Sequence, residues 1–284
     1  MSPTIRRATP EDIQACAQIC YDAFYKINTD HNFPPEIPSV DFANMILGMM
    51  FSHPGFYCVV AEADGQILGS NCMDERSPIS GIGPITIDPN VQNGGVGRSL
   101  MNAMLDRARE RNVPGVRLVQ AAFHNRSLSL YTKLGFDPRE PLSCMQGPAI
   151  GKTMGDCQVR PATEADLFEC NRLCAQIHGI HRGGDLAESI GRGAVVVERQ
   201  GRIAGYSTVL GFFGHSIAES MEDLQALIAS AEKFEGPGIL VPTRNAELFR
   251  WCLENGLRVV EPLTLMTLGY YAEPSGAYLP SILY

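Results

Sequence analysis

The sequence contains no apolar run of the roughly 18 residues that a membrane-spanning helix needs. Its start, Met1 to Asp12, is polar and lacks the apolar core of a signal peptide. Basic residues do not cluster either, and the formal net charge is −8 at pH 7. The sequence therefore offers no basic patch for a nucleic acid or an anionic membrane. We expect a cytoplasmic protein with no membrane partner and no nucleic-acid partner.

Metal ligands at a recognisable spacing are also missing. The chain has nine cysteines, and the pairs Cys16/Cys20 and Cys170/Cys174 each place two thiols four residues apart, on one helix face. No histidine or second cysteine pair accompanies either pair at a ligand-like spacing. Free cysteine packs as a small apolar residue. We therefore predict packed, reduced thiols and no metal.

What the sequence does contain is an internal repeat. Three blocks recur in the same order, with offsets of 154, 136 and 121 residues. They begin with Ile5 and Val159, with Val59 and Val195, and with Leu134 and Asn255. Three collinear blocks indicate one ancestral unit that lost residues twice in its second copy. We predict two domains, residues 1–150 and 156–284, joined through a segment rich in glycine and small residues.

Periodicity in the first copy indicates a mixed architecture. Short apolar or alternating runs predict strands at 5–8, 57–61, 66–73, 82–87 and 115–121, and from 136 onward. Helical spacing predicts helices within 9–20 and 33–50 and over 99–111 and 126–134. This order favours the α/β or mixed α+β class, with a mixed, largely antiparallel sheet flanked by helices in each domain.

The most informative stretch runs from Ile85 to Arg98. A predicted strand enters a turn containing Gly94, Gly95 and Gly97, which opens directly into a predicted helix. The N–H groups and the dipole at a helix N-terminus favour an anion, and glycines let a phosphate approach the backbone. Arg98 can add a charge-assisted contact. Taken alone, this turn also fits a plain tight turn or a dinucleotide site, although its spacing differs from Gly-x-Gly-x-x-Gly.

The combination of motifs resembles the GCN5-related N-acetyltransferase (GNAT) superfamily. The motifs are Ile87-Asp-Pro, then Gln92-x-x-Gly-x-Gly-Arg98, then Leu130-Tyr-x-x-Leu-Gly-Phe136, and the likeness spans residues 5–145. The resemblance implies acetyl-CoA as cosubstrate, with its pyrophosphate on the glycine-rich loop and its pantetheine arm along the preceding strand. The cofactor-binding residues that it implies are Ile85, Thr86, Ile87, Gln92, Asn93, Gly94, Gly95, Val96, Gly97, Arg98, Asn125, Ser127 and Tyr131.

The same resemblance implies catalytic roles for three residues. Tyr131, four residues after Ser127, would protonate the departing thiolate, because a phenol of pKa ~10 is still protonated at pH 7. The alternative is that its ring only packs. His124 stands where the family often has asparagine, and it either relays a proton or hydrogen-bonds backbone. Glu75, beside Asp74, is the local candidate for the base that deprotonates the amine, unless both belong to a solvated turn.

The second copy lacks these features when the offset of 121 is extended through it. The extension places Phe213–Glu219 opposite the glycine-rich loop. Both essential glycines then become Ser216 and Ala218, and the arginine becomes Glu219, whose charge repels a pyrophosphate. The tyrosine becomes Cys252. We predict a degenerate second domain without a CoA site, which could line the acceptor cleft.

The sequence thus predicts an N-acetyltransferase in which an acceptor amine attacks the acetyl thioester directly, without a metal. The alternative is a non-catalytic acyl-CoA-binding or sensing module. The acceptor is left open among small amines, antibiotics, amino acids and peptide N-termini, and the oligomeric state is not specified. The polar stretch 178–185 either faces substrate or is a shortened loop.

Overall fold

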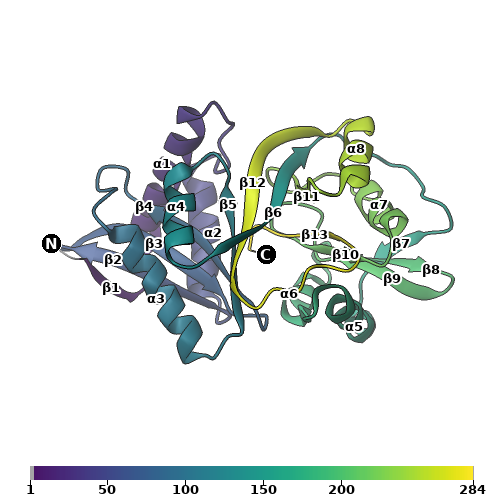
Figure 1. Ribbon diagram of the computed structural model, residues 1–284, viewed down its shortest axis with the longest axis horizontal. Helices are drawn as coiled ribbons and strands as arrows, with labels where there is room; N and C mark the ends of the chain where they lie inside the picture. Colours follow the sequence, from purple (N-terminus) through teal and green to yellow (C-terminus); the bar gives the residue numbers. More distant parts are fainter. Residues whose placement is uncertain (1–2, 284) are drawn as a thin grey trace. The chain divides into compact units, whose positions relative to one another are not determined.

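The computed structural model describes residues 3–283, and the chain divides into two compact units (Figure 1). The first unit is the chain up to residue 118 together with 124–134. The second is 119–123 together with the chain from 135 onward. The predicted domains 1–150 and 156–284 follow the repeat, and they stay a prediction about its two copies. The compact units are divided elsewhere because one strand of the first copy lies in the second unit.

The first unit is a sheet with helices on both faces. Its strands are ordered β1-β2-β3-β4-β5, and all neighbours are antiparallel except β4 and β5. The strand bounds are β1 Thr4–Arg7, β2 Phe56–Ala63, β3 Gln66–Asp74, β4 Ser80–Ile87 and β5 Gly115–Ala121. The helices are η1 Pro10–Asp12, α1 Ile13–Asp30, α2 Val40–Ser52, α3 Val96–Glu110 and α4 Asn125–Lys133.

Two neighbouring residues of β3 show which helices cover which face of this sheet. The hydroxyl of Ser70 contacts the thiol of Cys16 in α1. The amide of Asn71 donates to the sulfur of Met101 in α3, at 3.5 Å. Because successive strand side chains point to opposite faces, α1 and α3 lie on opposite sides of the sheet. Helix α2 packs against α1.

The second unit contains strands of two sheets. One sheet runs from the end of β5 through β12 and β6 to β11, and the other is ordered β13-β10-β9-β8-β7. The strands are β6 Asp137–Gln146, β7 Gln158–Pro161, β8 Val195–Arg199, β9 Arg202–Ser207, β10 Ser216–Ala218, β11 Ile239–Pro242, β12 Arg258–Gly269 and β13 Ala277–Leu279. The helices are η2 Glu164–Asp166, α5 Leu167–His178, α6 Gly183–Ser189, α7 Met221–Ala229 and α8 Ala246–Glu254.

Local structure recurs where the sequence repeats. Arg6 forms ion pairs with Asp12 and Glu62, both at 2.7 Å. The second copy forms the same triad from the equivalent residues Arg160, Asp166 and Glu198. A bulge in the β2–β3 pair recurs at the equivalent residues of the β8–β9 pair. The repeat therefore extends to side-chain geometry.

The final strands of the two copies are exchanged. Strand β6 pairs antiparallel with β12, and Leu142 lies opposite its own equivalent, Leu263. The amide of Ala122, just after β5, donates to the carbonyl of Pro262 in β12 at 3.0 Å, and the equivalent bond joins the end of β11 to β6. The last strand of each copy therefore lies beside the preceding strand of the other (Figure 1).

Three further findings concern features that the sequence lacked. Over residues 3–283, no helix is both long and apolar enough to cross a bilayer. The same residues bring no three His, Cys, Asp or Glu side chains together in a way that could hold a metal ion. All nine cysteines lie within this described range and are thiols outside any disulfide, and all but Cys157 are buried.

Candidate functional site

The glycine-rich loop ends at a helix that begins without a side-chain cap. Helix α3 starts at Val96, three residues before the predicted start, and its N-cap is Gly95 in the left-handed region with φ +86°. No side chain among residues 3–283 caps this helix, whereas Ser39 caps α2. The first N–H groups of a helix have no partner within the helix. Those of α3 are therefore available to an anion.

The two glycines that flank the helix start act differently. A Cβ on Gly97 would lie 3.2 Å from Cδ1 of Ile87 and 3.5 Å from Cδ2 of Leu130. The missing side chain of Gly97 therefore lets α3 pack closely on β4 and α4. A Cβ on Gly95 would meet nothing within 4 Å, so glycine is favoured there by its positive φ alone.

The other loop residues present a mixture of groups. Asn93, Gly94 and Arg98 are exposed, and their N–H, carbonyl and guanidinium groups are open to a ligand. The Gln92 amide donates to the carbonyl of Ile87 at 3.4 Å and so holds the loop against β4. Val96 is buried, so only its backbone can contact a cofactor.

One edge of β4 is open beside this loop. In the described chain, β4 pairs with β5 at Ser80 and Gly81, the first two residues of the strand, and not beyond. The backbone edge of the remaining residues is therefore free of a neighbouring strand. The two strands separate after this pairing and leave a fork, which gives an extended amide-containing ligand a place to add to the sheet.

The hydrogen-bond pattern shows which residues of β4 face the fork. The amide of Asp88 donates to the carbonyl of Leu68, so its backbone faces β3. Backbone direction alternates along a strand, so Thr86 also faces β3, while Ile85 and Ile87 face the fork. The Thr86 side chain is buried, with its hydroxyl 3.4 Å from that of Ser70. Of the three predicted strand residues, Ile85 and Ile87 are thus positioned for backbone contacts with a ligand.

Tyr131 lies in α4, directly after Leu130, whose side chain lies beside Gly97. Only 7% of its surface is exposed. Burial raises the pKa of its phenol above the ordinary value of 10. The hydroxyl therefore stays protonated at neutral pH, which a proton donor requires.

His124 is the N-cap residue of α4. Burial, followed by the nearby charges of Arg126 and His31, lowers its pKa to about 4. The imidazole is therefore neutral at pH 7. The Ser127 hydroxyl donates to the His124 carbonyl at 2.9 Å, and Asn125 is exposed in the first turn.

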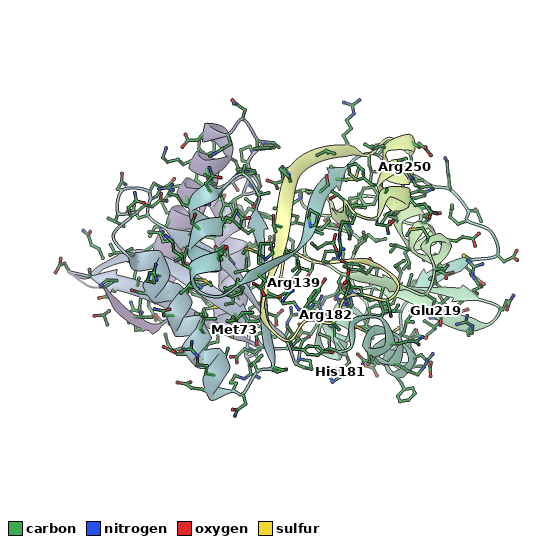
Figure 2. All side chains as sticks on the ribbon, viewed as in Figure 1. Met73, Arg139, His181, Arg182, Glu219 and Arg250 are labelled. Atoms are coloured by element: carbon green, nitrogen blue, oxygen red, sulfur yellow. The ribbon has the colours of Figure 1, made fainter. Side chains whose placement is uncertain are left out.

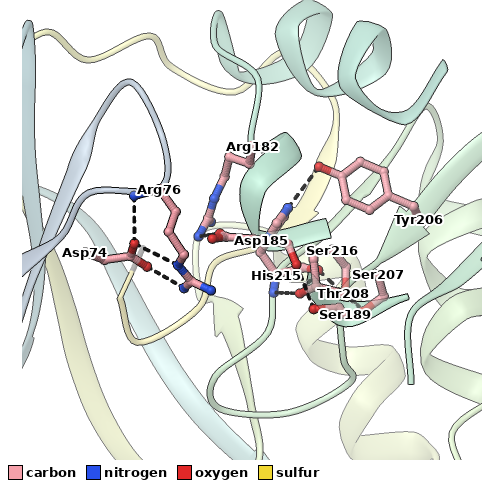
Figure 3. A network of polar contacts seen from close by, with 10 residues as sticks. All are labelled: Asp74, Arg76, Arg182, Asp185, Ser189, Tyr206, Ser207, Thr208, His215 and Ser216. Atoms are coloured by element: carbon pink, nitrogen blue, oxygen red, sulfur yellow. Dashed lines mark hydrogen bonds and ion pairs between the residues drawn. The ribbon is translucent and has the colours of Figure 1, made fainter. Parts of the chain in front are cut away.

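Glu75 is held by two arginines of the α3 end that lies away from the glycine-rich loop. Its carboxylate contacts Arg107 at 2.9 Å and Arg111 at 2.7 Å. Burial by itself would raise the pKa of Glu75, but the arginines outweigh it and leave that pKa below its ordinary value. Asp74 is likewise held by Arg76 (Figure 3). These contacts tie both carboxylates to structural partners, so their role as a general base stays a prediction that the pairing does not favour.

The alignment of Phe213–Glu219 with the glycine-rich loop is wrong. The offset of 136 makes Gly205 in β9 equivalent to Gly69 in β3. Gly205 pairs with Ala218, and Gly69 pairs with Ile87. Strand β10 therefore corresponds to the end of β4. The error arises because residues are missing from the second copy both before and after this strand. The offset of 121 therefore holds only from β11 onward, and Cys252 in α8 does replace the tyrosine.

The second copy has in fact lost the loop altogether. Only Glu219, labelled in Figure 2, and Ser220 separate β10 from α7, whereas residues 88–95 separate β4 from α3. The Ser220 hydroxyl accepts from the amide of Asp223 at 3.2 Å and caps α7. The N-terminus of α7 is therefore already occupied by a side chain, unlike that of α3.

The stretch 178–185 connects α5 to α6 and contains buried charged residues. Arg182 and Asp185 are buried and form an ion pair at the start of α6. Asp185 lies 3.8 Å from Nδ1 of His215, whose Nε2 is 2.9 Å from the hydroxyl of Tyr206 (Figure 3). The charges in the stretch were a signal of this network, but nothing in the sequence marked His215 or Tyr206.

The fork, the uncapped helix and the buried tyrosine all lie in the first unit. Residues 16–136 match the model of the acetyltransferase (GNAT) family. This match lies within the first copy of the repeat and covers less than half of the chain.

The relatives differ in how much of the chain they cover. A mycothiol acetyltransferase of Nocardia farcinica is 42% identical over 65 residues, which is 23% of this chain and only 22% of that protein. A Pyrococcus horikoshii protein, proposed to be an acetyltransferase, aligns with a TM-score of 0.74 and 19% identity, over 97% of this chain and 92% of its own. A GCN5-related N-acetyltransferase of Sphaerobacter thermophilus aligns with a TM-score of 0.63 and 14% identity. That alignment covers 97% of this chain and 98% of the other. The whole two-unit chain therefore shares its fold with these structures.

Proposed function

We propose that this protein transfers an acetyl group from acetyl-CoA to a primary amine. The observation that carries the proposal is the uncapped N-terminus of α3, with Gly95 at φ +86°, beside the open edge of β4. The match of residues 16–136 to the GNAT family model supports acyl transfer as the reaction class. The acceptor amine is the finer part of the proposal.

The residues present fit the two polar parts of acetyl-CoA. Its pyrophosphate would be held by the N–H groups at the start of α3 and by the exposed guanidinium of Arg98. Its amide-containing arm would add to the fork edge through the backbone of Ile85 and Ile87. Gly97 would keep α3 close enough to β4 for both contacts to occur together. Asn125, Ser127, Gln92, Asn93, Gly94 and Val96 complete the proposed set, whereas Thr86 faces β3 and is left out of it.

The chain's contribution to the chemistry is positioning and one proton. The cosubstrate supplies an acetyl thioester, whose C–S bond breaks as the amine nitrogen forms the new C–N bond. Tyr131 donates its proton to the departing sulfur, for which its raised pKa keeps the proton available. The amine nitrogen loses a proton as the amide forms, and His124, neutral at pH 7, can accept that proton, although it carries no charge to stabilise a thiolate. Holding the reactants together supplies the remainder of the acceleration.

The test is release of free CoA thiol during incubation with a panel of amines, amino acids and short peptides. Calorimetry with acetyl-CoA in the absence of acceptor measures binding separately. We expect one site per chain and thiol release with at least one class of amine. Binding without turnover over the whole panel would instead support the acyl-CoA-binding module, and no binding would refute both functions.

A further inference from the structure

The segment after β12 returns and adds a short strand to the second copy. Strand β13 pairs antiparallel with β10, with Ala277 opposite Ala218 and Leu279 opposite Ser216 (Figure 1). Nothing in the sequence indicated this strand, because three residues carry no periodicity. It forms the edge of its sheet.

The position of β13 has a counterpart in the first copy. The register of β10 makes its three residues equivalent to Ile85–Ile87. The carbonyl-and-amide edge that β10 offers to β13 is thus the edge that β4 leaves open at the fork. Among residues 3–283, no strand pairs with this edge in the first copy, whereas β13 pairs with it in the second.

Side chains of β13 reach the hydrophobic clusters of the second unit. Ala277 and Leu279 belong to the cluster that contains Leu227 and Val241. Tyr278, between them, belongs to the separate cluster that contains Cys174. All three strand residues are at most 8% exposed. An alternating strand that fills two apolar clusters is the pattern expected of a specifically seated segment.

Polar contacts fix the segment before, within and after the strand. The Ser275 amide donates to the carbonyl of Ile177 at 3.0 Å, and the Ile282 amide donates to that of Phe212 at 2.8 Å. The Tyr278 hydroxyl donates to the buried carboxylate of Glu140 at 3.3 Å. Its ring also meets that of His178 edge-on, with 5.1 Å between the centroids.

We propose that the second copy retains a strand-binding groove whose ligand is this chain's own segment 275–283. Backbone pairing along β10 gives affinity, and the buried Tyr278 and Leu279 give specificity. The segment takes the place that the amide arm of acetyl-CoA takes in the first copy. That comparison rests on the proposed function, whereas the groove itself does not.

The experiment separates the segment from its groove without removing it during folding. A protease site is inserted between Ala272 and the exposed Glu273, and the folded full-length chain is then cut. We expect the released segment to stay bound through gel filtration. Excess labelled peptide 273–283 then exchanges into the groove, as measured by fluorescence anisotropy. Unlabelled peptide is then used to displace the segment and is itself removed. Hydrogen exchange at the amides of Ser216 and Ala218, which face β13, should then rise at least 100-fold.

Matched peptides test the contacts. The Tyr278→Ala peptide should bind at least tenfold more weakly, because it loses the buried ring and the bond to Glu140. The Glu273→Gln peptide should bind within about twofold of the parent, because Glu273 forms only a surface ion pair with Arg244. Equal binding of both variants, or unchanged exchange at Ser216 and Ala218 after removal of the segment, would overturn the proposal.

Calorimetry with acetyl-CoA on the same cut protein distinguishes this proposal from the proposed function. We expect one site before and after removal of the segment, because the second copy lacks the loop at α7. A second site appearing on removal would contradict the assignment of the groove to peptide alone. If the uncut protein binds no acetyl-CoA at all, acetyl-CoA is refuted as the cosubstrate. The peptide results would still stand.

Discussion

Changing Gly95 to alanine tests the anion site while leaving every contact in place. Gly95 has φ +86°, and its new Cβ would meet nothing within 4 Å. The cost is therefore backbone strain, about 1–2 kcal/mol for an L residue in the left-handed region. If the loop relaxes to a negative φ, the first N–H groups of α3 turn away from the bound anion. We expect acetyl-CoA affinity to fall about 5–30-fold, the equivalent of that strain.

Gly65 offers a matched control. It lies in the turn between β2 and β3, has φ +75° and would likewise have nothing within 4 Å of an added Cβ. Gly65→Ala should lose about the same free energy of unfolding in urea as Gly95→Ala, with no change in acetyl-CoA affinity. Calorimetry measures the affinity, and urea unfolding measures the stability. Equal affinity losses in both variants, or none in either, would show that the start of α3 is not the anion site.

Three further predictions concern catalysis, strand exchange and pH. Tyr131→Phe should lower kcat about 100-fold or more with acetyl-CoA affinity nearly unchanged, and a normal kcat in steady-state assays would return the ring to a packing role. The fragment 1–147 should fail to give a cooperative unfolding transition, because β6 loses its partner β12, and co-expression with 148–284 should restore it; a stable, folded fragment would contradict the exchange. The lowered pKa of His124 means that the unfolded chain binds its proton first. The free energy of unfolding should therefore decline as pH falls from about 6.5 towards 4, and His124→Asn should reduce that decline in urea titrations at pH 7 and pH 5; an unchanged decline would count against it.

Much of the fold could be predicted from the repeat, because repeated residues keep repeated contacts. The order of Arg6, Asp12 and Glu62 recurs at the first two offsets, and the structure turns that recurrence into two matching ion-pair triads. The glycine-rich loop was likewise recognisable, since a strand, a glycine-rich turn and a helix follow each other directly. Local patterns of this kind need no knowledge of distant parts of the chain.

Features that depend on distant pairing were not predictable. Strands β6 and β12 carry the same Glu-Pro-Leu pattern, so either could complete either sheet, and periodicity does not choose between them. The ion pair of Glu75 could not be predicted from the sequence, because its partner Arg107 lies 32 positions away. The offset of 121 misaligned residues 213–219 with the glycine-rich loop. The offset between the two copies changes on each side of β10, because residues are deleted there in the second copy.

The exchanged strands also determine how early the first copy can complete its sheet during synthesis. The end of β5 bonds to Pro262, which is made about 140 residues after Ala122. At roughly 5–20 residues per second, the ribosome needs about 7–28 s to supply that strand. Until then the first copy has an unfinished sheet edge, which invites pairing with another nascent chain. Slow translation of the second half therefore lengthens the interval in which the first half depends on protection by a chaperone.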